Sequence, residues 1–471
     1  MAAARNLAFA LLKIELLAIL RIASYQTTCW HSVLFEPPII PSTAMDPSTN
    51  KTARDEPYPN HDETCTKHMK KAMEIHSRHP LLDGHNDLPW ALRCCFAMNW
   101  SRLDLRQNWE GKVVEGCPWQ CLHTDIPRLK QGGVGAQLWS VYIPTIGSDG
   151  EVMDPATAIS LTLEQIDAVH NLCELYPDTF EMVQSARDIE RIFREGKIPS
   201  MCGVEGGHQM GGSLRVLRMF RKLGVRYMTL THNGGPGWAD PAVNADGSFC
   251  KEALVGGLND FGKQVVLEMN RIGMTVDLSH VHHECMHAAL DVTKAPVIFS
   301  HSSTRALCRH PRDVPDDVLK RLPENGGVCM IVFLSKFVAG EFWVAGGKVG
   351  ATIVEVADHV DKVVEIAGID HVGIGGDYDG GALFARGLED VSKYPALTCE
   401  LLKRGYIEED LAKLFGKNVI RVLIECENVS EELKTQKMPI GEAHWGPELY
   451  ETNLMKEERL LSTKSNPLER I

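Results

Sequence analysis

Three absences narrow the class of this protein. Beyond the N-terminal region, no segment of the 471 residues reaches the about 18 uncharged apolar residues that a membrane-spanning helix needs. There is no long basic run, and 49 basic against 62 acidic residues give a formal charge of −13, which disfavours nucleic acid and anionic membranes as partners. The 14 cysteines are too dilute for a small domain held by disulfides. With 44% hydrophobic residues, the chain is expected to be globular with a sizeable core.

The termini carry mixed targeting signals. The apolar stretch "NLAFALLKIELLAIL" is either a secretory leader or an amphipathic helix, because Lys13 and Glu15 interrupt it. Asn-x-Ser/Thr triplets at Asn50, Asn99 and Asn428 are compatible with secretion and N-glycosylation. The charged C-terminal segment lacks the apolar tail of a lipid-anchor signal, so a glycolipid anchor is not expected.

The remaining composition predicts one large domain. The stretch from Phe35 to Asp62 is rich in Pro, Ser, Thr and Asn, so residues 1–62 are expected to form a leader and a loosely held arm. Residues 63–430 are expected to be a single domain, and residues 431–471 a C-terminal tail. Most cysteines lie in apolar runs, as in "GVCMIVFL", and are expected to be buried thiols. At Cys94–Cys95 and in "CPWQC", Cys117–Cys121, a disulfide is an open alternative.

Short apolar runs alternate with helical patterns along this domain. Patterns such as "SLTLEQIDAVHNLCELY", "LNDFGKQVVLEMNRIG" and "VEVADHVDKVVEIAG" repeat apolar residues every three or four positions, which is typical of helices. Eight βα units favour a closed (β/α)₈ TIM-type barrel over an open sheet. The eight predicted strands are "PLLDGHND", "VGAQLWSVYI", "PSMCGVEGG", "VRYMTLTH", "TVDLSH", "PVIFSHS", "GGVCMIVFL" and "HVGIGGDYDG".

Ionisable residues of metal-binding type end most of these strands. In a (β/α)₈ barrel the strand C-termini meet on the face that carries the active site, so these side chains are expected to gather there. For the first pair alone, a turn at the strand end is an alternative to a metal site. The residues are His85, Asp87, Glu205, His232, His280, His301 and Asp377.

Imidazoles and carboxylates without nearby thiolates favour Zn²⁺ over Mn²⁺ or Fe²⁺. The set is large enough for two ions, with Glu205 as a bridging carboxylate between Gly203, Gly206 and Gly207. A water between two such ions has a lowered pKa and can supply hydroxide near neutral pH.

A second histidine pattern points to different chemistry. "HECMH", His283–His287, matches the H-E-x-x-H pattern of zinc proteases. The extended form of that motif fails because Leu290 replaces its glycine, and the next glutamate after Glu284 is Glu324. We therefore interpret the segment as the hydrated face of a helix.

Seven motifs together resemble one family. "DGHNDLPW", "GVEGGH", "TLTHN", "DLSH", "PVIFSHSS", "RDVPDDVL" and "VGIGGDYDG" occur in this order over most of the span from His79 to Cys426. They are similar to the membrane dipeptidase (renal dipeptidase) family of the amidohydrolase-type barrels. The resemblance implies one zinc held by His85, Asp87 and Glu205, and a second zinc held by Glu205, His280 and His301.

The resemblance also implies roles for three further residues. His232 matches the histidine that contacts the substrate and the oxyanion at the scissile carbonyl, and Asp377 matches the residue that moves the proton. Together with Glu205 they form the expected catalytic set. Arg312 matches the arginine that holds the terminal carboxylate of the substrate. Without the resemblance, Arg312 would be read as a surface arginine paired with Asp313, Asp316 or Asp317.

The leading expectation is therefore a zinc-dependent dipeptidase that uses metal-bridged hydroxide. Two alternatives stay open: a binuclear amidohydrolase acting on a cyclic amide, lactone or ester, and a non-catalytic, receptor-like homologue. The resemblance further implies a homodimer and a secreted or extracellular, membrane-associated location. The family's loop disulfides after the second and fourth strands are not expected, because "IPTIGS" and "HNGGPGW" contain no cysteine.

Overall fold

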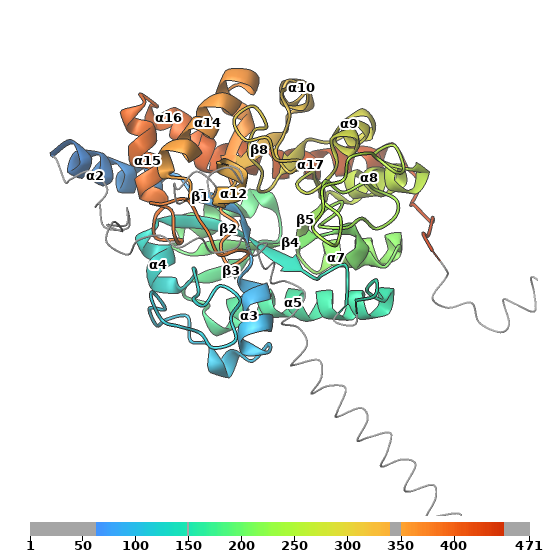
Figure 1. Ribbon diagram of the computed structural model, residues 1–471, viewed down its shortest axis with the longest axis horizontal. Helices are drawn as coiled ribbons and strands as arrows, with labels where there is room; N and C mark the ends of the chain where they lie inside the picture. Colours follow the sequence, from blue (N-terminus) through green and yellow to red (C-terminus); the bar gives the residue numbers. More distant parts are fainter. Residues whose placement is uncertain (1–62, 148–149, 340–349, 447–471) are drawn as a thin grey trace, which may run out of the picture. The chain divides into compact units, whose positions relative to one another are not determined.

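The computed structural model describes residues 63–147, 150–339 and 350–446 (Figure 1). Eight parallel strands follow one another in the order β1-β2-β4-β5-β6-β7-β8-β9, and β3 pairs with β4 outside this path. The eight strands on the path coincide with the eight predicted runs. The strands are β1 (Leu81–Asn86), β2 (Val134–Tyr142), β3 (Phe180–Met182), β4 (Ile198–Glu205), β5 (Val225–Thr229), β6 (Thr275–Asp277), β7 (Val297–Phe299), β8 (Val328–Ile331) and β9 (Val372–Ile374).

Backbone hydrogen bonds just beyond β9 bring its chain end back to β1. The Asp377 N–H donates to the His85 carbonyl at 3.0 Å, and the Asp87 N–H donates to the Tyr378 carbonyl at 2.8 Å. The buried Asp83 carboxylate accepts from the Gly376 N–H at 2.7 Å in the same seam. The strands therefore form a nearly closed barrel, which confirms the predicted (β/α)₈ fold.

Helices connect the strands, and the three quoted helical patterns correspond to α5, α8 and α14. α14 begins at a capping box in which the Thr352 N–H donates to Glu355 at 2.8 Å. The helices are α2 (Glu63–Arg78), α3 (Leu88–Phe96), α4 (Ile126–Gln131), α5 (Pro155–Leu175), α6 (Ile189–Arg194), α7 (Leu214–Lys222), α8 (Asp260–Ile272), α9 (His283–Val292), α10 (Asp316–Leu319), α11 (Leu322–Asn325), α12 (Ser335–Val338), α14 (Ile353–Ala367), α15 (Tyr394–Lys403), α16 (Glu408–Ala412) and α17 (Asn418–Thr435).

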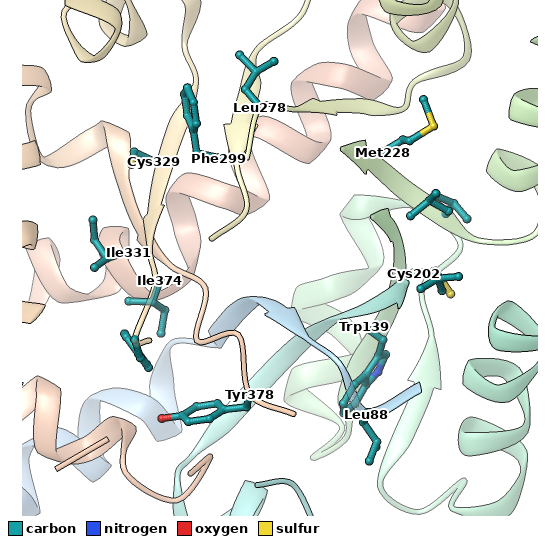
Figure 2. Close-up of a cluster of buried hydrophobic side chains, with 14 of the residues drawn as sticks. Leu88, Trp139, Cys202, Met228, Leu278, Phe299, Cys329, Ile331, Ile374 and Tyr378 are labelled. Carbon is teal, nitrogen blue, oxygen red and sulfur yellow. The ribbon is translucent and has the colours of Figure 1, made fainter. Parts of the chain in front are cut away.

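The eight strands on the path are buried on both faces, which explains why the runs are largely apolar. Along β8, for example, Cys329 belongs to one apolar cluster, and its neighbours Val328 and Met330 belong to another. The first cluster joins the strands to the surrounding helices, and Figure 2 shows part of it, with side chains from several strands. The second cluster lies inside the barrel and toward α17. Some buried polar side chains also lie within the strands, among them Asp83, Gln137 and Asp277.

Two parts of the chain stand apart from the barrel description. Between β2 and α5, Ile146 and Val152 form an antiparallel bridge in a stretch of which residues 148 and 149 are not described. The predicted leader, the arm and the Asn50 triplet lie outside the described residues, as does most of the predicted tail. α17 runs to Thr435, past the predicted domain end at residue 430. None of the described helices is long and apolar enough to cross a membrane.

Candidate metal centre

The predicted metal ligands converge at the C-terminal ends of the strands. We call His85, Asp87, Glu205, His280 and His301 the rim cluster. His85 lies in β1 and Glu205 is the last residue of β4, whereas Asp87, His280 and His301 lie one to three residues beyond their strands. All five are at least nine-tenths buried. Residues up to 216 positions apart in the chain, His85 to His301, thus share one enclosed site, with ring centroids 3.8 Å apart.

One oxygen of Glu205 faces two histidines. Glu205 Oε1 lies 3.0 Å from His280 Nε2 and 3.4 Å from His301 Nε2. The two Nε2 atoms are themselves 3.0 Å apart. Ligand atoms bound at about 2.0–2.1 Å to a tetrahedral ion are separated by roughly 3.3 Å, so these three atoms match three corners of such a site.

The other oxygen of Glu205 faces the β1 pair. Glu205 Oε2 lies 3.5 Å from His85 Nε2, which is 3.4 Å from Asp87 Oδ2. His85 Nε2 is buried and has no hydrogen-bond partner. A buried nitrogen left without a partner needs an explanation, and a metal ion would supply one. Glu205 is therefore positioned to bridge two ions, because each oxygen faces a different donor group.

Residues behind the cluster fix the orientation of its rings. His301 Nδ1 lies 2.8 Å from Ser300 Oγ, and that hydroxyl donates to Asp277 at 2.7 Å. The Ser300 oxygen is then left to accept from His301 Nδ1–H, which leaves the Nε2 lone pair for the rim. His85 Nδ1 is held in the same way by the Tyr227 hydroxyl, at 2.9 Å.

These supporting residues were missed by the sequence analysis. Tyr227 reaches His85 because Gly203 has no side chain, and a Cβ there would lie 2.0 Å from the Tyr227 ring. Asp277 also accepts from Thr229 Oγ1 at 2.6 Å, so its carboxylate is fully engaged inside the barrel. The only available signal was that Tyr227 and Asp277 lie within strands whose ends carry the predicted ligands.

Burial and nearby charges shift the pKa values of the rim histidines in opposite directions. Burial lowers the pKa of His280 and His301 well below the usual value, which keeps both rings neutral and able to bind metal. For His85, burial also lowers the pKa, but Tyr227 and the carboxylates Asp87 and Glu205 outweigh it and raise the pKa well above its usual value. Anionic surroundings that favour a proton at this position also favour a metal cation.

His232 and Asp377 border the rim cluster. His232 Nε2 lies 3.7 Å from Glu205 Oε1, and burial lowers the pKa of this ring well below its usual value. Asp377 Oδ1 lies 3.9 Å from His85 Nε2, and burial raises the pKa of this carboxyl well above its usual value, so burial favours its protonated form. Asp377 has a φ of 64° and His280 a φ of 67°, strained conformations for residues other than glycine that cluster at functional sites.

Arg312 is buried, which contradicts the reading of a surface arginine. The residue is 2% exposed, its guanidinium lies over the Phe337 ring at 5.0 Å, and burial lowers its pKa. Its Nη atoms donate at 3.4 Å to Ser302 Oγ and to the His301 carbonyl, and Nε has no partner. Within the described residues it forms no ion pair with a carboxylate. A buried guanidinium beside the rim cluster, lacking an anion, is suited to receive one.

Asp379 and the cysteines of the connection after β1 can also be placed. Asp379 accepts from the His123 N–H at 2.8 Å. Cys94 Sγ and Cys95 Sγ are 3.5 Å apart, and Cys94, Cys95, Cys117 and Cys121 form no disulfide in this structure.

Comparisons with known proteins show the family of this chain and structures that share its fold. Residues 69–437 match the family model described as membrane dipeptidase (Peptidase family M19). The chain is similar to "Dipeptidase verJ" of Clonostachys rogersoniana, with 42% identity over 370 residues, which is 78% of this chain and 89% of that protein. Two crystal structures share the fold. A probable dipeptidase PvdM from Pseudomonas aeruginosa has a TM-score of 0.67 at 21% identity, covering 79% of this chain and 100% of that one. A metallo peptidase from Rhodobacter sphaeroides, liganded with a phosphinate mimic of the dipeptide L-Ala-D-Ala, has a TM-score of 0.62 at 23% identity, covering 74% and 99%.

Proposed function

Because this chain belongs to the membrane dipeptidase family of hydrolases that act on peptide bonds, we propose that it hydrolyses dipeptides with two zinc ions held by the rim cluster. The observation that carries the proposal is the Glu205 carboxylate, whose two oxygens face separate groups of donors. The donors are imidazoles and carboxylates, which suit zinc. Two bound zinc ions would supply Lewis acidity and lower the pKa of a water between them.

The surrounding side chains supply substrate binding and proton movement. His232, which burial keeps neutral, is proposed to donate a hydrogen bond to the carbonyl oxygen as it gains charge. Asp377, whose pKa burial raises, is proposed to carry a proton to the departing amine. Arg312 is proposed to bind the terminal carboxylate of the substrate, which restricts the enzyme to short peptides.

The test measures metal content and dipeptide hydrolysis on the same purified protein. We expect close to two zinc ions per chain, hydrolysis of simple dipeptides, loss of that activity after chelation, and recovery when zinc is added back. A zinc-loaded protein that is inert toward a broad dipeptide panel would contradict the proposal and favour the receptor-like alternative.

Arg312 distinguishes a dipeptidase from a binuclear hydrolase of neutral esters or cyclic amides. In Arg312→Gln we expect kcat/KM for dipeptides to fall roughly 30- to 1,000-fold, because a buried charge pair with the substrate is lost. Hydrolysis of a neutral ester that fits the site should change little. If both substrates lose activity equally, Arg312 does not bind the carboxylate.

We also propose, from the family resemblance, that the protein is secreted, associates with a membrane and forms a homodimer. For N-glycosylation, Asn99 is the more accessible described position, because it is exposed and caps a short 3₁₀ turn. Asn428 lies within α17 and hydrogen-bonds Arg187 and Glu425.

A further inference from the structure

A second group of histidines and a carboxylate converges outside the barrel rim. We call His283, His287 and Asp317 the surface cluster. His283 and His287 are separated by one turn at the start of α9, and Asp317 is the second residue of α10. Asp317 Oδ2 lies 3.0 Å from His283 Nε2 and 2.9 Å from His287 Nε2, and the two nitrogens are 3.1 Å apart. Asp317 was not predicted as a third ligand, because only the glutamates that follow Glu284 were compared with the H-E-x-x-H pattern.

Hydrogen bonding alone does not satisfy this triangle. For both rings to bond the carboxylate oxygen, each Nε2 must carry a proton, and the two N–H groups then face each other across 3.1 Å. A single cation inside the triangle removes the conflict, because both nitrogens and the oxygen can then present lone pairs to it. The edges of 2.9–3.1 Å are close to those of a tetrahedral ion bound at about 2.0–2.1 Å.

We propose that the surface cluster binds one divalent transition-metal ion of the zinc class, separately from the rim cluster. Two imidazoles and a carboxylate select zinc-type ions over Mg²⁺ or Ca²⁺. The side chains of His283, His287 and Asp317 are 33%, 28% and 56% exposed, so the ion can exchange and water can complete its coordination.

The two elements that carry the ligands are anchored in the protein. α9 buries Cys285, Met286, Ala289 and Leu290 against the core, which fixes the face that presents both histidines. α10 buries Val318, the neighbour of Asp317. α9 follows the His280 segment of the rim and α10 follows the Arg312 segment, so a bound ion would tie together two connections that lead from the rim.

Arg321 opposes metal binding at this cluster. Its Nη1 lies 3.0 Å from His287 Nδ1 and can only donate. When His287 Nε2 binds a metal, the neutral ring carries its proton on Nδ1, and two donors then face each other. Arg321 would have to rely on its hydrogen bond to Asp291, at 2.6 Å. The native cluster is therefore expected to bind zinc less tightly than its three ligands alone allow.

The first test counts metal ions. Holoprotein with the rim cluster filled is titrated with Zn²⁺, and bound zinc is measured by equilibrium dialysis and elemental analysis. We expect one further equivalent per chain, which is lost in the double variant His283→Gln and His287→Gln. It should persist in His79→Gln, a matched control in which a lone histidine lies 3.5 Å from Glu408.

Glu205→Gln separates this inference from the proposed function. It should lose rim zinc and retain the surface equivalent, whichever reaction the rim performs. If wild type and the double variant bind equal amounts of zinc, the surface cluster is an ion pair only and the proposal is overturned.

The second test uses a gain of affinity, which a misfolded variant cannot produce. In Arg321→Gln the amide oxygen can accept from His287 Nδ1–H, so we expect zinc affinity at the surface cluster to rise about tenfold. Co²⁺ in place of Zn²⁺ gives a visible absorption band that reports the same change. An affinity that is unchanged or reduced would overturn the assigned role of His287 Nε2.

Discussion

The rim cluster and the surface cluster lie three residues apart in the chain, at His280 and His283, yet they differ in almost everything except donor spacing. In both clusters imidazole nitrogens and a carboxylate oxygen lie about 3 Å apart. His280 is 7% exposed with a strained backbone, whereas the side chain of His283 is 33% exposed and begins a regular helix. Converging donors thus indicate where a metal can bind, and enclosure indicates where chemistry can occur.

The clusters also differ in what lies behind each ring. His301 is backed by Ser300, whose hydroxyl is bound to a carboxylate, so the free lone pair points to the rim. His287 is backed by the cation Arg321, which favours a proton on Nε2 instead. A histidine at the rim therefore presents its Nε2 lone pair to a metal, whereas Arg321 favours His287 at the surface as a hydrogen-bond donor through Nε2.

The largest expected effect comes from removing the carboxylate that the rim donors share. In Glu205→Gln we expect rim zinc to be lost and kcat/KM for dipeptides to fall at least about 1,000-fold, because the amide has one oxygen instead of two and carries no charge. Activity and metal content measured together check this. Glu284→Gln, in the exposed face of α9, is the matched control and should change neither.

A buried histidine outside both clusters separates burial from metal binding. His76 in α2 is 2% exposed, but both of its ring nitrogens have partners, the Gly132 carbonyl at 3.3 Å and Thr398 Oγ1 at 2.8 Å. Burial lowers its pKa to about 4, against 6.5 for a free ring. We interpret this histidine as structural, because no nitrogen is left for an ion.

The His76 pKa predicts a pH dependence of stability. Because the folded-state pKa lies below the unfolded value, protonation favours the unfolded chain. The contribution of neutral His76 is therefore complete above about pH 6.5 and declines as pH falls toward 4, by at most about 3 kcal/mol. Urea unfolding in a chelator at several pH values, compared with His76→Gln, checks the difference between the two profiles. Parallel profiles between pH 4 and 6.5 would contradict it.

A smaller effect is expected from the support behind His301. In Ser300→Ala the ring loses the acceptor for Nδ1–H, and we expect zinc affinity at the rim to fall about 10- to 100-fold. Ser430→Ala is the matched control. It removes another buried hydroxyl, which donates to the Arg271 carbonyl at 2.7 Å and supports no residue of either cluster. Competition with a chelator measures both variants, and equal affinity losses would show that the Ser300 effect is general destabilisation.

The sequence was sufficient for the barrel because the strands and the ligands obey local rules. Runs such as "GGVCMIVFL" are apolar on both faces, and the residues that end them are polar. Counting eight such runs, each followed by a helical pattern, was enough to predict the barrel. β3 was missed because Phe180–Met182 is only three residues long and pairs outside the main strand order. A run this short has no periodicity to detect.

The site was predictable only as far as the side chains that end strands. Tyr227 and Asp277 support the ligands from inside the barrel. A residue within a strand is normally interpreted as part of the packed core, so neither was predicted to belong to the site. Asp317 comes from a different element, 30 residues after His287, and nothing in the spacing of "HECMH" points to it. Without the family resemblance, Arg312 was interpreted as a surface residue. The sequence does not show whether the neighbouring carboxylates of Asp313 and Asp317 pair with this arginine or face elsewhere.

The smallest effect should come from the surface cluster without metal. In chelator, Asp317→Asn removes an exposed ion pair whose members are 56% and about a third exposed, so the free energy of unfolding should fall by no more than about 1 kcal/mol. With zinc present the same substitution should also abolish the zinc-dependent rise in melting temperature that binding to the folded state produces. Differential scanning fluorimetry with and without Zn²⁺ measures both. A loss well above 1 kcal/mol in chelator would mean that this cluster stabilises the fold even without metal.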